Sequence, residues 1–155
     1  MATTVTPATL SVTLTENYLL DGVRYGNSRV KTIASQGEVD QRVMSISTKG
    51  ELATAWTTIL ALDAVDAQGQ VVKADYAYFR ITNLDDTNNL NLRLYNGADY
   101  LYFSITPLDS FMLLSPDVDA TTSTGVVTFA NIEAIVGQSN SATEDIDIEY
   151  LIVTA

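Results

Sequence analysis

Apolar and polar residues alternate with a period of two along much of this chain. Leu10, Val12 and Leu14 alternate with serine and threonine, and residues 90–95 repeat the pattern with three leucines. Residues 145–154 form another alternating run. Because successive side chains of a strand point to opposite faces of a sheet, this period predicts β-strands with one buried face.

Strand-like runs rich in Val, Ile, Tyr, Phe and Thr recur about every ten residues, which is typical of a sandwich or barrel. Turn dipeptides occur at Asp21-Gly22 and Gly26-Asn27. Residues 76–105 predict three consecutive antiparallel strands, with a type I′ turn at Asn96-Gly97. We expect strands at residues 10–15, 29–33, 39–47, 57–62, 76–82, 90–95, 100–105, 111–114 and 145–154, strand or mixed structure at 126–136, and a polar loop at 137–144.

These runs make eight to ten strands with no clear helix, so we predict an all-β fold. The expected architecture is a two-sheet antiparallel β-sandwich, with a jelly-roll arrangement. The length of 155 residues suits one domain. Residues 1–9 are rich in Thr and Ala and predict an extended N-terminal arm, and residues 10–155 a single β-sandwich domain. The N-terminal arm could add a strand to a neighbour's sheet or form a disordered tail.

Composition excludes several classes of function. The sequence has no histidine and no cysteine, which removes the commonest general base, the thiolate nucleophile and the usual zinc ligands. We therefore expect no enzymatic activity, no cofactor and no metal centre. No apolar run approaches the roughly 20 residues of a membrane span, and the N-terminus lacks signal-peptide features. We expect synthesis in a cytoplasm and no membrane partner.

The net charge of −11 disfavours a nucleic-acid partner, because phosphate binding depends on Lys and Arg. The charge is also uneven. Residues 1–93 carry eight bases and ten acids, whereas residues 94–155 carry nine acids and no base. The acidic second half could meet a partner with a basic face, or could serve solubility alone.

Carboxylates are the abundant acid–base groups. A glycosidase pair could come from Asp75, Asp85, Asp86, Asp99 and Asp109, although solvated turn carboxylates explain them better. Asp117 and Asp119, or residues 144–147, have oxygen ligands for calcium but lack EF-hand spacing. Both sets of acidic residues are better explained as solvated acidic loops than as calcium sites.

Two arginines and three tyrosines are the candidate interface residues. Arg80 and Arg93 fall on adjacent predicted strands near Asp85 and Asp86, where each could form an intrachain charge pair or contact a partner. Tyr95, Tyr100 and Tyr102, together with Trp56, could form a sugar platform, a protein interface or ordinary packing.

Residues 78–88, YFRITNLDDTN, followed by LRL at 92–94 and ITPLDSF at 105–111, resemble a stretch of small virion proteins of tailed phages. At 108–109 this chain has Leu-Asp where some of those relatives have Gly. The resembled proteins are capsid decoration, or cement, proteins: β-sandwich or jelly-roll subunits on the head, often trimeric, with no catalytic residues.

The resemblance implies a structural protein on the outer surface of the virion head, assembled in the host cytoplasm. Its partners would be the major capsid protein and further copies of itself, as a homotrimer. The alternative function is a receptor- or carbohydrate-binding module of a phage tail or fibre, which would use Tyr100 and Tyr102.

Overall fold

The computed structural model describes residues 8–35, 39–46, 56–63, 71–72, 76–95, 100–113, 120–122, 125–127 and 132–154. Every regular element in these ranges is a β-strand, which confirms the predicted all-β class. None of these residues belongs to a helix long and apolar enough to cross a membrane.

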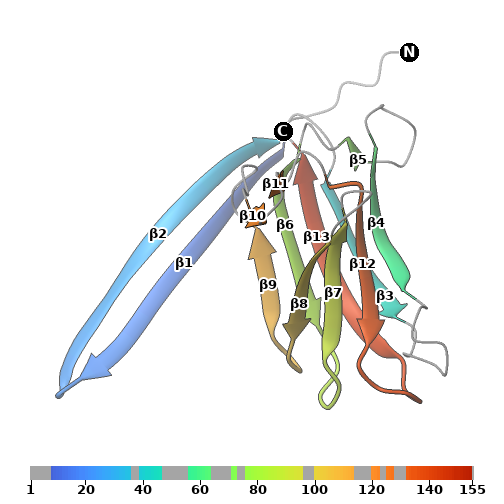
Figure 1. The fold of residues 1–155 in the computed structure, drawn as a ribbon. Coiled ribbons are helices and arrows are strands. Elements are labelled where there is room, and N and C mark those ends of the chain that lie inside the picture. The colour runs from blue at the N-terminus through green and yellow to red at the C-terminus, as the bar shows by residue number, and fades with distance from the viewer. Residues whose placement is uncertain are drawn as a thin grey trace.

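The smaller of the two main sheets has four strands in the order β3-β13-β6-β9, all antiparallel. Its members are β3 (Val39–Ile46), β13 (Ile146–Thr154), β6 (Tyr76–Asn83) and β9 (Ser110–Leu113). The last strand of the chain therefore lies between an early strand and a middle one, and long-range pairing builds this sheet (Figure 1).

The larger sheet has five strands in the order β5-β4-β12-β7-β8. They are β5 (Val71–Val72), β4 (Thr57–Asp63), β12 (Ala134–Ser139), β7 (Leu90–Tyr95) and β8 (Tyr100–Ile105). The two-residue strand β5 pairs with β4 in parallel, so the expectation of wholly antiparallel sheets is wrong at this edge. A short hairpin, β10 (Ala120–Thr122) with β11 (Gly125–Val127), stands apart from both sheets in the pairing.

Side chains from both main sheets form one hydrophobic core cluster. Leu90, Leu92 and Leu94 contribute from β7 and are at most 1% exposed, as their alternation predicts. Ile146 and Ile148 contribute from β13 on the opposite sheet. The alternating patterns of these two strands therefore bury their apolar faces against each other's sheets.

The prediction of three consecutive antiparallel strands over residues 76–105 is wrong in part. β7 and β8 form the expected antiparallel pair, but β6 belongs to the other sheet, where it pairs with β13 and β9. Residues 84–89 therefore carry the chain from one sheet to the other. The turn Asn96-Gly97 lies outside the described residues.

Asn83 stabilises this crossing, the connection at residues 84–89 between the two sheets. Its side chain is fully buried, and its amide donates to the carbonyl oxygens of Asn88, Ile105 and Thr106. Its amide oxygen accepts the backbone N–H of Asp85. One polar side chain thus joins the crossing to the turn that leaves β8, because a buried amide must find partners for its donors and acceptor.

The turn between β8 and β9 contains a backbone conformation that side chains rarely adopt. Leu108 has a φ of 61°, in the left-handed region, and its N–H donates to the carbonyl oxygen of Asp85. Its side chain is exposed. The turn before Phe111 therefore places a leucine in the left-handed region, at a cost in backbone strain of about 1–2 kcal/mol.

Strands β1 (Ala8–Leu20) and β2 (Val23–Ser35) form a long hairpin that reaches away from both sheets (Figure 1). Asp21 and Gly22 both have positive φ and join the strands through a two-residue loop, as in a type I′ turn. We call β1 and β2 the hairpin arm. It begins within the predicted N-terminal arm, whose residues 1–7 lie outside the described part of the chain.

The second predicted turn, Gly26-Asn27, is wrong because both residues lie inside β2. Gly26 pairs with Asn17, and a Cβ at this position would overlap the carbonyl oxygen of Glu16. Glycine is required here by the close approach of two strands, which resembles a turn signal in sequence.

The predicted loop at 137–144 begins later than expected. β12 continues to Ser139, and Gln138 and Ser139 are buried although both are polar. The expected strand at 126–136 divides between the end of β11 and the start of β12. A prediction based on hydrophobicity ends this strand too early, because its last residues are polar although they are buried.

Candidate functional site

Four of the five candidate interface residues lie together on the outer face of the five-stranded sheet. Register pairs Arg93 on β7 with Tyr102 on β8, and Tyr95 with Tyr100. Arg93 and Tyr95 alternate with the buried leucines of β7, and Tyr102 and Tyr100 are their register partners, so all four side chains leave the sheet on the side away from the core. The rings of Tyr95 and Tyr100 are 6.3 Å apart between centroids.

The guanidinium group of Arg93 lies among three aromatic rings. Its Cζ atom is 3.7 Å from the centroid of the Trp56 ring, 4.4 Å from that of Tyr100 and 5.6 Å from that of Tyr102. All three distances fall within the range of cation–π attraction. Tyr102 also meets Trp56 edge-on, with ring centroids 5.9 Å apart. We call Trp56, Arg93, Tyr100 and Tyr102 the aromatic cluster.

The aromatic cluster combines stacking surface with hydrogen-bond donors. Tyr100 and Tyr102 are each about half exposed, and the Nε of Arg93 is buried without a hydrogen-bond partner. Arg42 pairs with Asp40 and Arg80 with Glu149, whereas the contacts shown for Arg93 among the described residues are with aromatic rings. A stacked guanidinium keeps donors at its edge, so this face can bind a planar or acidic group.

Arg80, the fifth candidate, lies on the other sheet. It forms an ion pair with Glu149 on the neighbouring strand β13. The predicted adjacency of Arg80 and Arg93 is wrong, because β6 and β7 belong to different sheets. The intrachain role proposed for Arg80 is present, but with Glu149 in place of the aspartates of the turn.

The turn aspartates have local structural roles. Asp85 accepts the backbone N–H groups of Thr87 and Asn88, and these hydrogen bonds hold the pKa of its carboxyl below the usual value. Asp86 accepts the hydroxyl of Thr87. Asp109 accepts the hydroxyl of Thr106. These carboxylates therefore cap the backbone and hydroxyl groups of the turns beside β6 and β8.

The other carboxylates considered for catalysis or calcium divide into two groups. Asp75, Asp99, Asp117 and Asp119 lie outside the described residues. Glu144 accepts the side-chain amide of Asn88. Within the described ranges, no three His, Cys, Asp or Glu residues lie where they could hold a metal ion.

A second surface emerges from the hairpin arm, and sequence analysis missed most of it. One face carries mainly threonine, serine and asparagine, with Thr15 and Ser28 joined across the strands, and it also includes Arg24 and the exposed Leu19 and Val30. The opposite face is apolar, and its residues are Leu10, Val12, Leu14, Tyr18, Leu20, Val23, Tyr25 and Ile33, interrupted by Glu16, Asn27, Arg29 and Lys31. We call it the apolar face of the arm.

Among the residues that the structure describes, the base of this apolar face packs against the four-stranded sheet. Leu10, Val12 and Ile33 pack with Tyr78 and Val153 of the four-stranded sheet. Beyond the base, the large apolar side chains of this face are exposed: Leu14, Tyr18, Leu20, Val23 and Tyr25 are 44–59% exposed. The alternation at 10–14 predicted one buried face, and its continuation to Leu20 was the signal for the rest.

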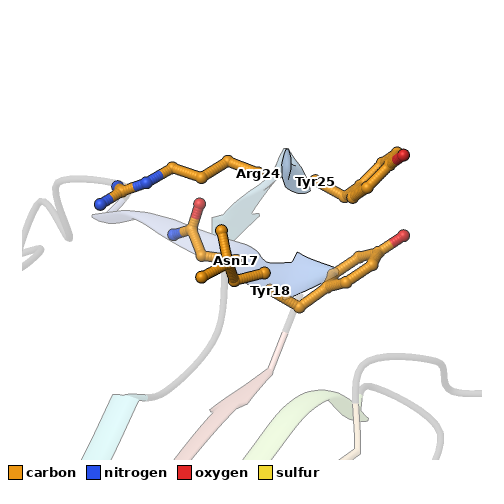
Figure 2. Close-up of a pocket in the computed structure, with 5 residues that line it drawn as sticks. Asn17, Tyr18, Arg24 and Tyr25 are labelled. Atoms are coloured by element: carbon orange, nitrogen blue, oxygen red, sulfur yellow. The ribbon is translucent and has the colours of Figure 1, made fainter. Parts of the chain in front are cut away.

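Tyrosine rings stack near the tip of the hairpin arm. Tyr18 and Tyr25 face each other across the two strands, with ring centroids 5.3 Å apart and an angle of 14° between ring planes. Figure 2 shows both rings projecting to one side, while Arg24 and Asn17 extend to the other. These residues and Leu19 line a shallow hollow of about 200 Å³. The tip therefore offers a preformed aromatic surface at the end of an extended ribbon.

The comparisons with known proteins return no match to a family model, to a curated protein or to a solved structure.

Proposed function

We propose that this protein is a non-enzymatic structural protein that decorates the outer surface of a tailed-phage head. The observation that carries the proposal is the uncovered apolar face of the hairpin arm. A two-stranded hairpin alone is at best marginally stable in water, and large exposed apolar patches mark sites of protein association. An arm of this kind is suited to lie against a neighbouring subunit in an assembly.

The strand order supports a jelly-roll sandwich for the body of the protein. Eight strands taken in chain order are β3, β4, β6, β7, β8, β9, β12 and β13. The first pairs with the eighth, the second with the seventh, the third with the sixth and the fourth with the fifth. This is the pairing of one long hairpin rolled into two sheets, an arrangement found in viral capsid and lectin domains.

The mechanism is stabilisation by selective binding. A protein that binds the assembled head and not its separated subunits shifts the equilibrium toward the assembled state. In this role the partners are the major capsid protein and copies of the chain itself, as a homotrimer. The chain would be assembled onto the head in the host cytoplasm.

Immunogold electron microscopy of source particles, with an antibody to this chain, tests the proposal. Label spread over the head is the expected result, and label confined to the tail would overturn it. Rebinding then tests the arm. Heads that lack the protein should bind the wild-type chain and the Thr13→Asp variant, which changes the polar face, but not the Tyr18→Asp variant, which changes the apolar face.

A carbohydrate-binding role in a tail or fibre is the second candidate, and the aromatic cluster favours it. Exposed tyrosines beside an arginine can stack on a sugar ring and donate hydrogen bonds to its oxygens. Binding to a host glycan that is lost in Tyr100→Ala and Tyr102→Ala, but kept in Tyr18→Ala on the hairpin arm, would support this role. Retention of glycan binding in both cluster variants would exclude the cluster as the site.

A further inference from the structure

The uncovered apolar face of the hairpin arm needs an occupant, and we propose that this occupant is a second copy of the same chain. Specifically, the arm of one copy docks on the outer face of the four-stranded sheet of the next. This inference rests on the proposed role of the arm in protein association and names its partner surface.

Charge separates the hairpin arm from the rest of the molecule. Residues 8–35 carry three bases, Arg24, Arg29 and Lys31, and two acids, for a net charge of +1. Residues 36–155 carry five bases and seventeen acids, for a net charge of −12. An arm is therefore attracted to the body of another copy and weakly repelled by another arm, which favours arm-to-body docking over arm-to-arm docking.

The four-stranded sheet has a matching outer face. Val39, Val43 and Met112 are exposed there, and register places Val43 beside Glu149 and Met112 beside Arg80. The arm's own base already packs on Tyr78 and Val153 of this same face. Arm and face are thus chemically compatible, because they are in contact at one end within a single chain.

The arm cannot cover the rest of this face in its own molecule. Figure 1 shows the hairpin departing from the sheets at an angle beyond its base, so that the two apolar surfaces diverge. At about 3.3 Å per residue, a 13-residue strand reaches roughly 43 Å, far enough to lie along a neighbouring subunit. A hollow of about 280 Å³, lined by Val12, Leu14 and Arg29 among others, offers a place for the partner's side chains.

Reciprocity follows from this geometry. Each copy has one arm to give and one face to receive, so copies can join arm to face, and a ring closes where the rotation from copy to copy returns to the first copy. The trimer of the proposed function is one such ring. Closure covers every apolar face, whereas an open chain would leave one exposed at its end.

The test is the mass of the purified full-length chain in solution, measured by light scattering after size exclusion across a wide range of concentration. Wild type should form a closed oligomer. Leu14→Asp on the apolar face of the arm should weaken self-association by at least about tenfold, as should Val43→Asp on the receiving face. Thr13→Asp on the polar face of the arm and Ser104→Asp on the other sheet are the matched controls and should associate as wild type.

Mixing the two defective variants sharpens the test. The Leu14→Asp copy keeps an intact face and the Val43→Asp copy keeps an intact arm, so the mixture should form a mixed complex that neither variant forms alone. Circular dichroism of each variant shows that it has folded. A wild-type chain that stays monomeric, or an oligomer that tolerates Leu14→Asp, would overturn the inference. Loss with Leu14→Asp but not with Val43→Asp would show arm-to-arm docking instead, which also overturns it.

The two proposals can fail separately. A monomer that still binds heads through its arm would refute self-docking and keep the decoration role. An oligomer that forms as expected, on a chain whose antibody labels no head, would refute the decoration role and keep self-docking.

Discussion

Strand β7 and the hairpin arm have the same alternating pattern but opposite exposure. The leucines of β7 are at most 1% exposed, whereas Leu14, Tyr18 and Leu20 of the arm are 44–59% exposed. The difference arises because β7 packs against a second sheet across the core, while the arm packs against the four-stranded sheet only at its base. Alternation therefore identifies which face of a strand is apolar, but not what covers that face.

The two regions also differ in what holds them together. The arm has a complete ladder of thirteen residue pairs and cross-strand contacts such as Tyr18 with Tyr25, each worth about 0.2–1 kcal/mol. β7 adds burial in a shared core, worth about 1.5–3 kcal/mol for each large apolar side chain. Local pairing can shape the arm, but the core supplies most of the stability of the body.

The largest expected difference is between equivalent leucine truncations. Leu92→Ala in β7 should lower the free energy of unfolding by about 2–5 kcal/mol, because it leaves a cavity in a fully buried site. Leu14→Ala in the arm should cost about 0.5 kcal/mol or less at concentrations where the chain is monomeric. Urea denaturation of both variants measures this, and equal losses would mean that the arm belongs to the core in solution.

Replacement of an asparagine by alanine should also lower the free energy of unfolding more in the body than in the arm, but the difference should be smaller than for leucine. Asn83→Ala removes a buried amide and leaves the carbonyl oxygens of Ile105 and Thr106 without this donor, at a cost of about 1–3 kcal/mol. Asn17→Ala, on the exposed polar face of the arm, should lie within about 0.5 kcal/mol of wild type. Denaturation midpoints compare them, and a neutral Asn83→Ala would mean that the crossing does not depend on this side chain.

Within the described part of the chain, Asp21 and Leu108 are the two non-glycine residues with a left-handed backbone, and replacing each by glycine should have different effects on stability. Leu108→Gly should raise the free energy of unfolding by about 1 kcal/mol, because it relieves strain at a φ of 61°. Asp21→Gly, at the arm tip with a φ of 50°, should change stability less, since aspartate tolerates this region better than leucine does. Thermal melting measures both, and destabilisation by Leu108→Gly would show that the exposed leucine makes contacts in the assembled or folded state.

Removal of the Arg93 cation from the aromatic cluster should change the fluorescence of Trp56 more clearly than it changes stability. Arg93→Ala should cost about 0.5–1 kcal/mol of cation–π attraction and shift the fluorescence of Trp56, the single tryptophan of the chain. Arg29→Ala, on the arm, should leave the emission unchanged and serves as the control. Unchanged emission in Arg93→Ala would mean that the guanidinium does not stack on the indole in solution.

The smallest expected effect is the titration of Asp85. Hydrogen bonds from the backbone of Thr87 and Asn88 lower its folded pKa below the ordinary value of 3.8. Its contribution to stability is therefore present above that value and lost as the pH falls through the lowered pKa. An NMR titration should find this carboxyl protonating below the ordinary value of 3.8, and protonation at or above that value would contradict the capping role.

Much of the body could be predicted from single strands, because each buried strand has a local pattern. The strands at 39–46, 90–95, 100–105 and 146–154 are found within one residue of expectation. Pairing could not be predicted in the same way. β6 and β7 are neighbours in sequence, but the buried amide of Asn83 and the capped turn after it send the chain to the other sheet.

The candidate site shows the same division. The common face of Tyr100 and Tyr102 follows from alternation along one strand. Their contact with Arg93 and Trp56 depends on the register between β7 and β8 and on the approach of residue 56, which directly precedes β4. Gly26 illustrates the opposite error, since a glycine required by close strand contact resembles a turn in sequence.

The sequence by itself determined the all-β class, the faces of the individual strands, the turn at Asp21-Gly22 and the strong negative charge, because each depends on neighbouring residues or on composition alone. Only the tertiary structure decided which strands share a sheet, which arginine meets a carboxylate and which meets aromatic rings, and where an apolar face is left uncovered. These features depend on contacts between residues far apart in the chain. An alternating pattern shows which face of a strand is apolar, but it does not show which element packs against that face.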